Sequence, residues 1–174
     1  MFMTNILLLI LIPIVGAFLI LLARKNANQR EAASFITAFS LFAVVLNLFN
    51  ASKINGEIVN LVQIFPGVSV AFFYDHLSVV FAFVASSLWI ITTLYSIGYM
   101  RGNKEQNQTR FFICFALALS ATMGVAFSAN LFTLYIFYEL LSVSTYALVG
   151  HHQTNEAKMG ARKYLIYLFG GSIG

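Results

Sequence analysis

One acidic residue, Glu139, lies inside a long apolar stretch, residues 131–150. An acidic side chain at the centre of a lipid-embedded helix costs about 2.5 to 3.5 kcal/mol, so such residues face a polar partner or a water-filled path. At helical spacing, Tyr135, Ser142 and Tyr146 share the face of Glu139. The stripe predicts a proton relay centred on Glu139. The alternative is structural, since a buried carboxyl can stay protonated and simply hydrogen-bond a neighbouring helix.

Three more titratable residues are candidates for the ends of an ion path. Asp75 lies just inside the third apolar stretch, where it is either a helix N-terminal cap or part of the outer mouth of the path. His151 follows the fifth stretch and titrates near neutrality, which suits proton uptake. Lys163 lies in a sixth stretch and can snorkel to the membrane surface or reach a neighbouring helix. Glu156 is the only other candidate ligand near His151 and His152, so no metal site is predicted. No soluble domain is present to hold a nucleotide or redox cofactor, so no cofactor is predicted either.

The composition predicts a membrane protein that must position these residues. Hydrophobic residues make up 60% of the chain and charged residues 9%, too few to cover a water-soluble domain. Five apolar stretches are each long enough to cross about 30 Å of hydrocarbon: residues 6–22, 32–49, 70–99, 111–127 and 131–150. A sixth begins near Glu156 and is still apolar at Gly174, so we expect the chain to end inside a membrane span, as a fragment, a split subunit or a truncated product.

The basic residues predict the orientation of these helices. Lysine and arginine gather in cytoplasmic loops. Nine of the ten lie after the first, third and fifth stretches, and Lys53 alone lies on the other side. The three basic loops are therefore expected in the cytoplasm and the N-terminus outside. The prediction is an all-α, polytopic helix bundle in the cell (inner or plasma) membrane, a single domain over residues 1–174 with about six transmembrane helices, the last incomplete.

Several connecting segments carry turn signals. The external loop 50–67 contains Asn55-Gly56 and Pro66-Gly67 and has room for a short extended segment. Residues 128–130 predict a tight hairpin that holds the fourth and fifth helices together. The small-residue strip Gly170-Gly171-Ser172 predicts close helix packing. The lone Cys114 has no partner for an intrachain disulfide and is expected to act as packing volume.

The residues around Glu139 resemble a known family. Residues 137–142 (Phe-Tyr-Glu-Leu-Leu-Ser) and the motifs in 144–152, 156–165 and 170–172 are similar to the antiporter-like subunits shared by respiratory complex I, Mrp-type cation/proton antiporters and membrane-bound hydrogenases. Residues 74–78 (Tyr-Asp-His-Leu-Ser) resemble the Asp-x-Leu-Ser at the start of that family's third helix. The resemblance covers most of the chain after residue 70.

The resemblance implies the N-terminal third of a 14-helix subunit. Glu139 then corresponds to the family's fifth-helix glutamate, which is thought to work as a charge pair with a lysine on helix seven. The implied function is translocation of protons, or exchange of sodium for protons, by a non-redox subunit of an oxidoreductase or antiporter complex. The alternative is a non-transporting structural or assembly subunit. The implied partners are other membrane subunits, a chain supplying the remaining helices among them, together with the lipid bilayer and protons or sodium ions; no nucleic acid is implied.

Overall fold

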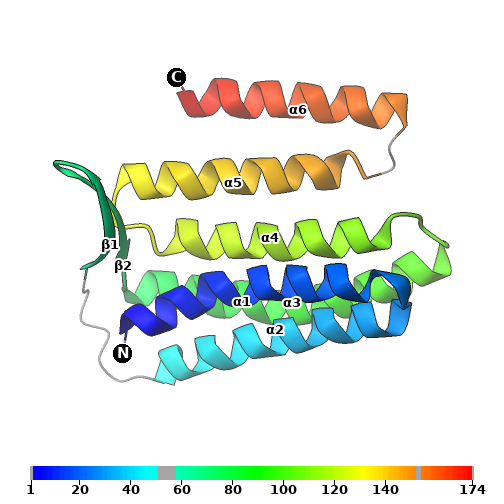
Figure 1. Ribbon diagram of the computed structural model, residues 1–174, viewed down its shortest axis with the longest axis horizontal. Helices are drawn as coiled ribbons and strands as arrows, with labels where there is room; N and C mark the ends of the chain where they lie inside the picture. Colours follow the sequence, from blue (N-terminus) through cyan, green and yellow to red (C-terminus); the bar gives the residue numbers. More distant parts are fainter. Residues whose placement is uncertain (1, 51–57, 152–153, 174) are drawn as a thin grey trace.

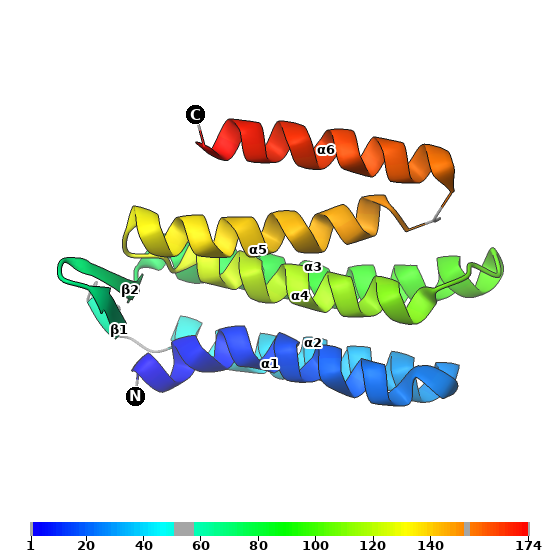
Figure 2. The same cartoon turned by 45° about the horizontal axis from the view of Figure 1, so that its top comes forward.

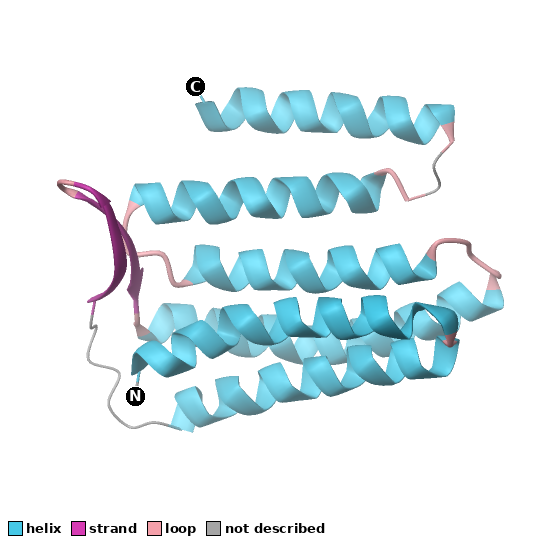
Figure 3. Cartoon of the chain, in the orientation of Figure 1, coloured by secondary structure: helices cyan, strands magenta, loops and turns pink. Residues whose placement is uncertain are grey.

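Six helices and one β-hairpin make up the computed structural model, which describes residues 2–50, 58–151 and 154–173 (Figures 1 and 3). A 3-10 turn, Ala23–Lys25, follows the first helix. The helices are α1 Phe2–Leu22, α2 Ala27–Asn50, α3 His76–Gly102, α4 Gln108–Ala126, α5 Leu131–Val149 and α6 Asn155–Ile173. Within the described residues, five helices, α1 to α5, are long and apolar enough to cross a membrane. The predicted all-α membrane bundle is therefore confirmed.

The helices pack in layers, with α6 outermost (Figure 2). Helix α1 packs against α2 and α4, α2 packs against α3, and α5 lies between α4 and α6. Helices α1 to α4 supply most of the buried apolar core, together with Phe72 and Tyr74, and Phe137 of α5 packs against its edge. Fully buried members of this core include Leu9, Leu41, Ala82 and Met123.

Two glycines permit the closest helix approaches. A Cβ at Gly16 of α1 would overlap the side chain of Thr37 on α2, and a Cβ at Gly124 of α4 would overlap the ring of Phe137 on α5. Gly170 and Gly171 are different, because both are exposed and a Cβ at either would meet open space. No other helix of the described chain packs against these two glycines, so the close packing expected of this strip stays a prediction.

A β-hairpin precedes α3. Strands β1 Ile58–Phe65 and β2 Val68–Phe73 pair antiparallel. Pro66 and Gly67 form the turn, and Gly67 has φ +90°, a conformation that suits glycine at the third position of a type II turn. The extended segment expected in the external loop is thus present, but it continues past Gly67. Residues 70–73, predicted to begin the third helix, belong to β2 instead, because Val70, Phe72 and Phe73 favour a strand.

Strand β2 is tied to the turn between α4 and α5. The backbone N–H of Phe73 donates to the carbonyl of Phe127 at 2.7 Å, and the N–H of Ala129 donates to the carbonyl of Ala71 at 2.9 Å. The buried N–H of Ala71 donates to Thr133 Oγ1 at 3.0 Å. These bonds fix the tight connection over residues 128–130 that the sequence predicted.

Tyr74 links the hairpin to α2. Its side chain is buried, its hydroxyl donates to the carbonyl of Leu48 at 3.0 Å, and its ring stacks on Phe127. Burial raises the pKa of Tyr74, so its hydroxyl stays protonated and keeps this bond at ordinary pH.

The two ends of the bundle differ in charge. The hairpin and the α4–α5 connection lie at one end, which we call the hairpin end, whereas the other three helix connections lie at the opposite end (Figure 1). The nine basic residues counted in the sequence belong to or flank those three connections. We call this the basic end; it is the one predicted to face the cytoplasm.

Candidate functional site

Helix α5 holds Glu139 near mid-depth. Asn130 caps the helix by accepting a hydrogen bond from the N–H of Thr133 at 2.8 Å, and Gly150 ends it. Glu139 lies about 12 Å from the hairpin end of α5 and about 15 Å from its basic end, at 1.5 Å per residue. Its side chain is half-buried. The other described acidic residues lie near helix ends or between helices: Glu31, Asp75, Glu105 and Glu156.

The residues of the predicted polar stripe differ in exposure along α5. Tyr135 is 42% exposed, whereas Ser142, one turn beyond Glu139, is buried and donates to the carbonyl of Tyr138 at 2.9 Å. Tyr146 is half-buried and lines a cavity at the basic end. The stripe therefore runs from an exposed surface at the hairpin end toward that cavity.

Lys163 of α6 does not lie at the depth of Glu139. A hydrogen bond of 3.2 Å between the hydroxyls of Thr145 and Tyr164 sets the register of the antiparallel pair α5 and α6. This register places Lys163 level with residue 146, about 10 Å along the helix axis from Glu139. Lys163 is exposed. It is thus better placed to reach the basic end than to pair with Glu139.

Asp75 is the N-cap of α3 at the hairpin end. Its carboxylate accepts a hydrogen bond from the N–H of Ser78 at 2.9 Å and another from the Ser78 hydroxyl. The helix-cap role considered for Asp75 is therefore present. A role at the outer mouth of an ion path stays a prediction.

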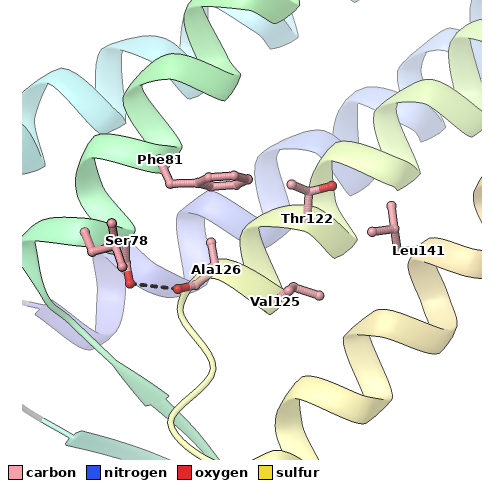
Figure 4. A pocket seen from close by; sticks show the side chains of 7 residues that line it. Ser78, Phe81, Thr122, Val125, Ala126 and Leu141 are labelled. Carbon is pink, nitrogen blue, oxygen red and sulfur yellow. Dashed lines mark hydrogen bonds between the residues drawn. The ribbon is translucent and has the colours of Figure 1, made fainter. Parts of the chain in front are cut away.

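A cavity of about 370 Å³ lies beside this cap, between α3, α4 and α5 (Figure 4). Its walls are mostly apolar, including Phe81, Val125 and Leu141. The two hydroxyls that line it both bond to backbone carbonyls: Ser78 to Ala126 at 2.7 Å, and Thr122 to Ala118 at 2.8 Å. An apolar cavity of this kind tends to stay dry, so it does not by itself extend the polar stripe.

His151 follows α5 at the basic end. Its backbone N–H donates to the carbonyl of Leu148 at 3.1 Å, and its half-buried ring meets the ring of Phe111 edge-on, with centroids 5.7 Å apart. His152 lies outside the described residues. The structure thus places Asp75 and His151 at opposite ends of the bundle, with Glu139 between them.

A buried ionic network at the basic end was missed by the sequence reasoning. Glu31 is 7% exposed and accepts two hydrogen bonds from Arg101, at 2.8 and 2.6 Å. The adjacent Arg30, also 7% exposed, donates to Gln108 and Thr109 at the start of α4. The network joins α2, α3 and α4. The signal in the sequence was the acidic residue Glu31 beside Arg30 in an otherwise basic segment.

Comparisons with known proteins point to one group of membrane proteins. The family model of the N-terminus of chain 5 of NADH-ubiquinone oxidoreductase (complex I) matches residues 66–112. The A1 component of a Na⁺/H⁺ antiporter of Staphylococcus haemolyticus is 27% identical over 168 residues, which cover 93% of this chain and 21% of that protein. A Na⁺/H⁺ antiporter component of Alkalihalophilus pseudofirmus is 27% identical over 91% of this chain and 20% of that protein.

A solved structure shares the fold. A chain of the membrane-bound sulfane sulfur reductase, an archaeal respiratory membrane complex, superposes with a TM-score of 0.81 at 20% identity, over 96% of this chain and 34% of that chain. The present chain spans about a fifth of the length of the curated relatives that it matches. The predicted relationship to the antiporter-like subunits is confirmed, and the chain is a multi-pass protein of the cell membrane.

Proposed function

We propose that this chain, a relative of the antiporter-like subunits, forms the N-terminal helix bundle of a subunit that translocates protons or exchanges sodium for protons. Glu139 is its relay carboxylate. The observation that carries the proposal is the position of Glu139 near the middle of a membrane-spanning helix, whereas the other described carboxylates lie near helix ends or between helices. A carboxylate at that depth is costly and therefore marks an ion or proton path.

The partner of Glu139 in this proposal is a lysine from another segment. Lys163 lies about 10 Å away along the helix axis, too far in depth for a direct pair. At the depth of Glu139 the surface of α5 and α6 is open, with a cavity of about 320 Å³ lined by Tyr135, Tyr138 and Gly171 among others. A further helix, from the same polypeptide or from another membrane subunit, fits on this side and brings the lysine.

The proposed mechanism follows from elementary electrostatics. An ammonium group close to a carboxylate stabilises its charged form, and withdrawal of the ammonium favours uptake of a proton. Movement of the lysine toward and away from Glu139 would therefore release and bind one proton per cycle. His151 is the candidate for proton uptake at the basic end and Asp75 for the outer mouth. The driving force would come from redox chemistry in another subunit or from a sodium gradient.

The test is Glu139→Gln in the full-length protein within its native complex. Glutamine keeps the shape but cannot exchange a proton, so we expect transport into inverted membrane vesicles to fall at least about 100-fold. Blue-native electrophoresis should show normal assembly. The matched control is Glu156→Gln, which removes the same charge from an exposed position in the first turn of α6 and should leave transport unchanged.

Two outcomes would contradict the proposal. Full transport by the Glu139→Gln protein would remove Glu139 from the relay. Reduced assembly with normal transport per assembled complex would instead support the alternative, a structural subunit in which Glu139 holds helices together.

A further inference from the structure

Three basic side chains converge on one cavity at the basic end. The cavity measures about 160 Å³ and lies between α4, α5 and α6, lined by Arg110, Tyr146, Gly150, Lys158, Ala161 and Arg162. Among the residues that the structure describes, this lining holds three cations and no acidic side chain. A single water occupies about 30 Å³ in the liquid, so the space admits a group of several atoms.

The cations reach the cavity from two helices, α4 and α6. Arg110 Nη2 donates to the carbonyl of Ala147 at 3.1 Å, which positions its guanidinium beside α5. The lack of a side chain at Gly150 keeps this space open, and the buried Ala161 packs close by, so α6 lies near α5 here. Lys158 and Arg162 stand one turn apart on α6 and therefore share a face.

Three cations around one space make it favourable for an anion. Arginine and lysine together suit a phosphate group, because the guanidinium binds two oxygens at once and the ammonium acts as a point charge. Basic cavities between membrane helices on the cytoplasmic side are typical binding sites of anionic lipid headgroups. We propose that Arg110, Lys158 and Arg162 bind the phosphate of an anionic membrane lipid.

The position of the cavity favours a lipid over a soluble phosphate. It lies where α4 and α5 leave the membrane, at the level of the headgroups. Ile166, one turn after Arg162 on the same stripe of α6, is 68% exposed, and Val149 at the end of α5 is 47% exposed. These apolar side chains offer a surface for an acyl chain below the phosphate. The site lies away from Glu139, and lipid binding there is tested without reference to the relay, although Tyr146 of the polar stripe lines the same cavity.

The experiment compares two double variants of the full-length protein that lose the same charge. Lys158→Gln with Arg162→Gln removes two cations from the cavity, and Arg24→Gln with Lys25→Gln removes two exposed cations from the same end of the bundle. Each protein is delipidated in detergent and titrated with phosphatidylglycerol, with phosphatidylcholine and with inorganic phosphate, and its thermal unfolding is followed.

Phosphatidylglycerol should stabilise the wild type and the Arg24/Lys25 variant equally, and phosphatidylcholine should stabilise neither. Each cation near a membrane surface contributes about 1 kcal/mol, so the Lys158/Arg162 variant should bind phosphatidylglycerol about 30-fold more weakly. Equal responses of the two variants would overturn the site. If inorganic phosphate alone reproduces the stabilisation and displaces the lipid, the lipid assignment is wrong.

Discussion

Helices α4 and α5 are neighbours with 19 residues each, yet 39% of the membrane-crossing window of α4 is buried against 17% of that of α5. Helix α4 packs between α1 and α5 and contributes to the core, whereas α5 packs against α4 and α6 and contributes Phe137 at the edge. The first four helices therefore form a packed scaffold. The helix that carries Glu139 is left with an open side.

Polar side chains serve different purposes in the two regions. In the scaffold, Glu31 is enclosed by Arg101 and Arg30, and the hydroxyl of Ser120 on α4 donates to the carbonyl of Ile10 on α1 at 2.8 Å. These groups fasten one helix to another. Around α5 and α6, Tyr135 and Tyr138 near Glu139, and the cations of the basic cavity, border open space instead. Scaffold substitutions should thus change stability, and substitutions on the open side should change transport or binding.

The largest stability effect is expected from Glu31→Gln. The substitution removes the carboxylate that neutralises Arg101 and the buried Arg30. The half-exposed Arg101 can be rehydrated, but the buried Arg30 loses the carboxylate 3.9 Å away, and we expect a loss of about 3 kcal/mol in the free energy of unfolding, the low end for a broken buried pair. Denaturant titration of the purified full-length protein measures it.

The exposed Glu156 supplies the control for this substitution. Glu156→Gln should change the free energy of unfolding by less than about 0.5 kcal/mol, as is usual for surface positions. Equal losses in the free energy of unfolding of both proteins would show that Glu31 does not hold the scaffold helices together. They would also remove the contrast between the scaffold and the open side.

A smaller loss is expected from Gly124→Ala, which probes the boundary between the regions. The new Cβ would overlap the ring of Phe137, which packs against Phe72 with centroids 5.6 Å apart. Overpacking of this kind costs about 1 to 3 kcal/mol. Gly98→Ala on α3 is the matched control, because a Cβ there meets open space and alanine favours a helix. Thermal unfolding should separate the two variants; a Gly98→Ala protein less stable than Gly124→Ala would contradict the packing described.

The sequence predicted the helices better than their contacts. The helices α1, α2, α4 and α5 were predicted from apolar stretches to within five residues at each end. The length needed to cross the hydrocarbon depends only on each stretch itself, so its signal is local in the sequence. The predicted start of α3 was wrong, because residues 70–73 are as apolar as the helix that follows them. Hydropathy does not distinguish a buried strand from a buried helix segment.

The sequence predicted which single residues belong to the candidate site and which helix faces they occupy, but not the contacts between helices. The sequence placed Glu139 in a span and Asp75 at a helix start, and both positions are found. It could not set the depth of Lys163 against Glu139, since that depends on the register of α5 and α6. The pairing of Glu31 with Arg101 joins residues 70 apart in the chain, and the sequence reasoning counted both Arg30 and Arg101 only as topological charges.

The smallest effect is expected from Thr145→Val, on the open side of α5. The Thr145 hydroxyl contacts the Tyr164 hydroxyl at 3.2 Å and also bonds within its own helix, so its loss should cost about 0.6 kcal/mol, the average for hydrogen bonds between membrane helices. Thr133→Val on the same helix is the matched variant. Thr133 is fully buried and accepts from the N–H of Ala71, so its loss strands a buried donor and should cost about 1 to 3 kcal/mol.

Thermal unfolding of these two threonine variants compares the packed end of α5 with its open side inside a single helix. If Thr145→Val destabilises the full-length protein as much as Thr133→Val, then the side of α5 toward α6 is as firmly packed as the scaffold side. In that case α6 is held to α5 as tightly as the scaffold helices are held to one another. An approach of the lysine to Glu139 from the side of α6 would then require α5 and α6 to separate.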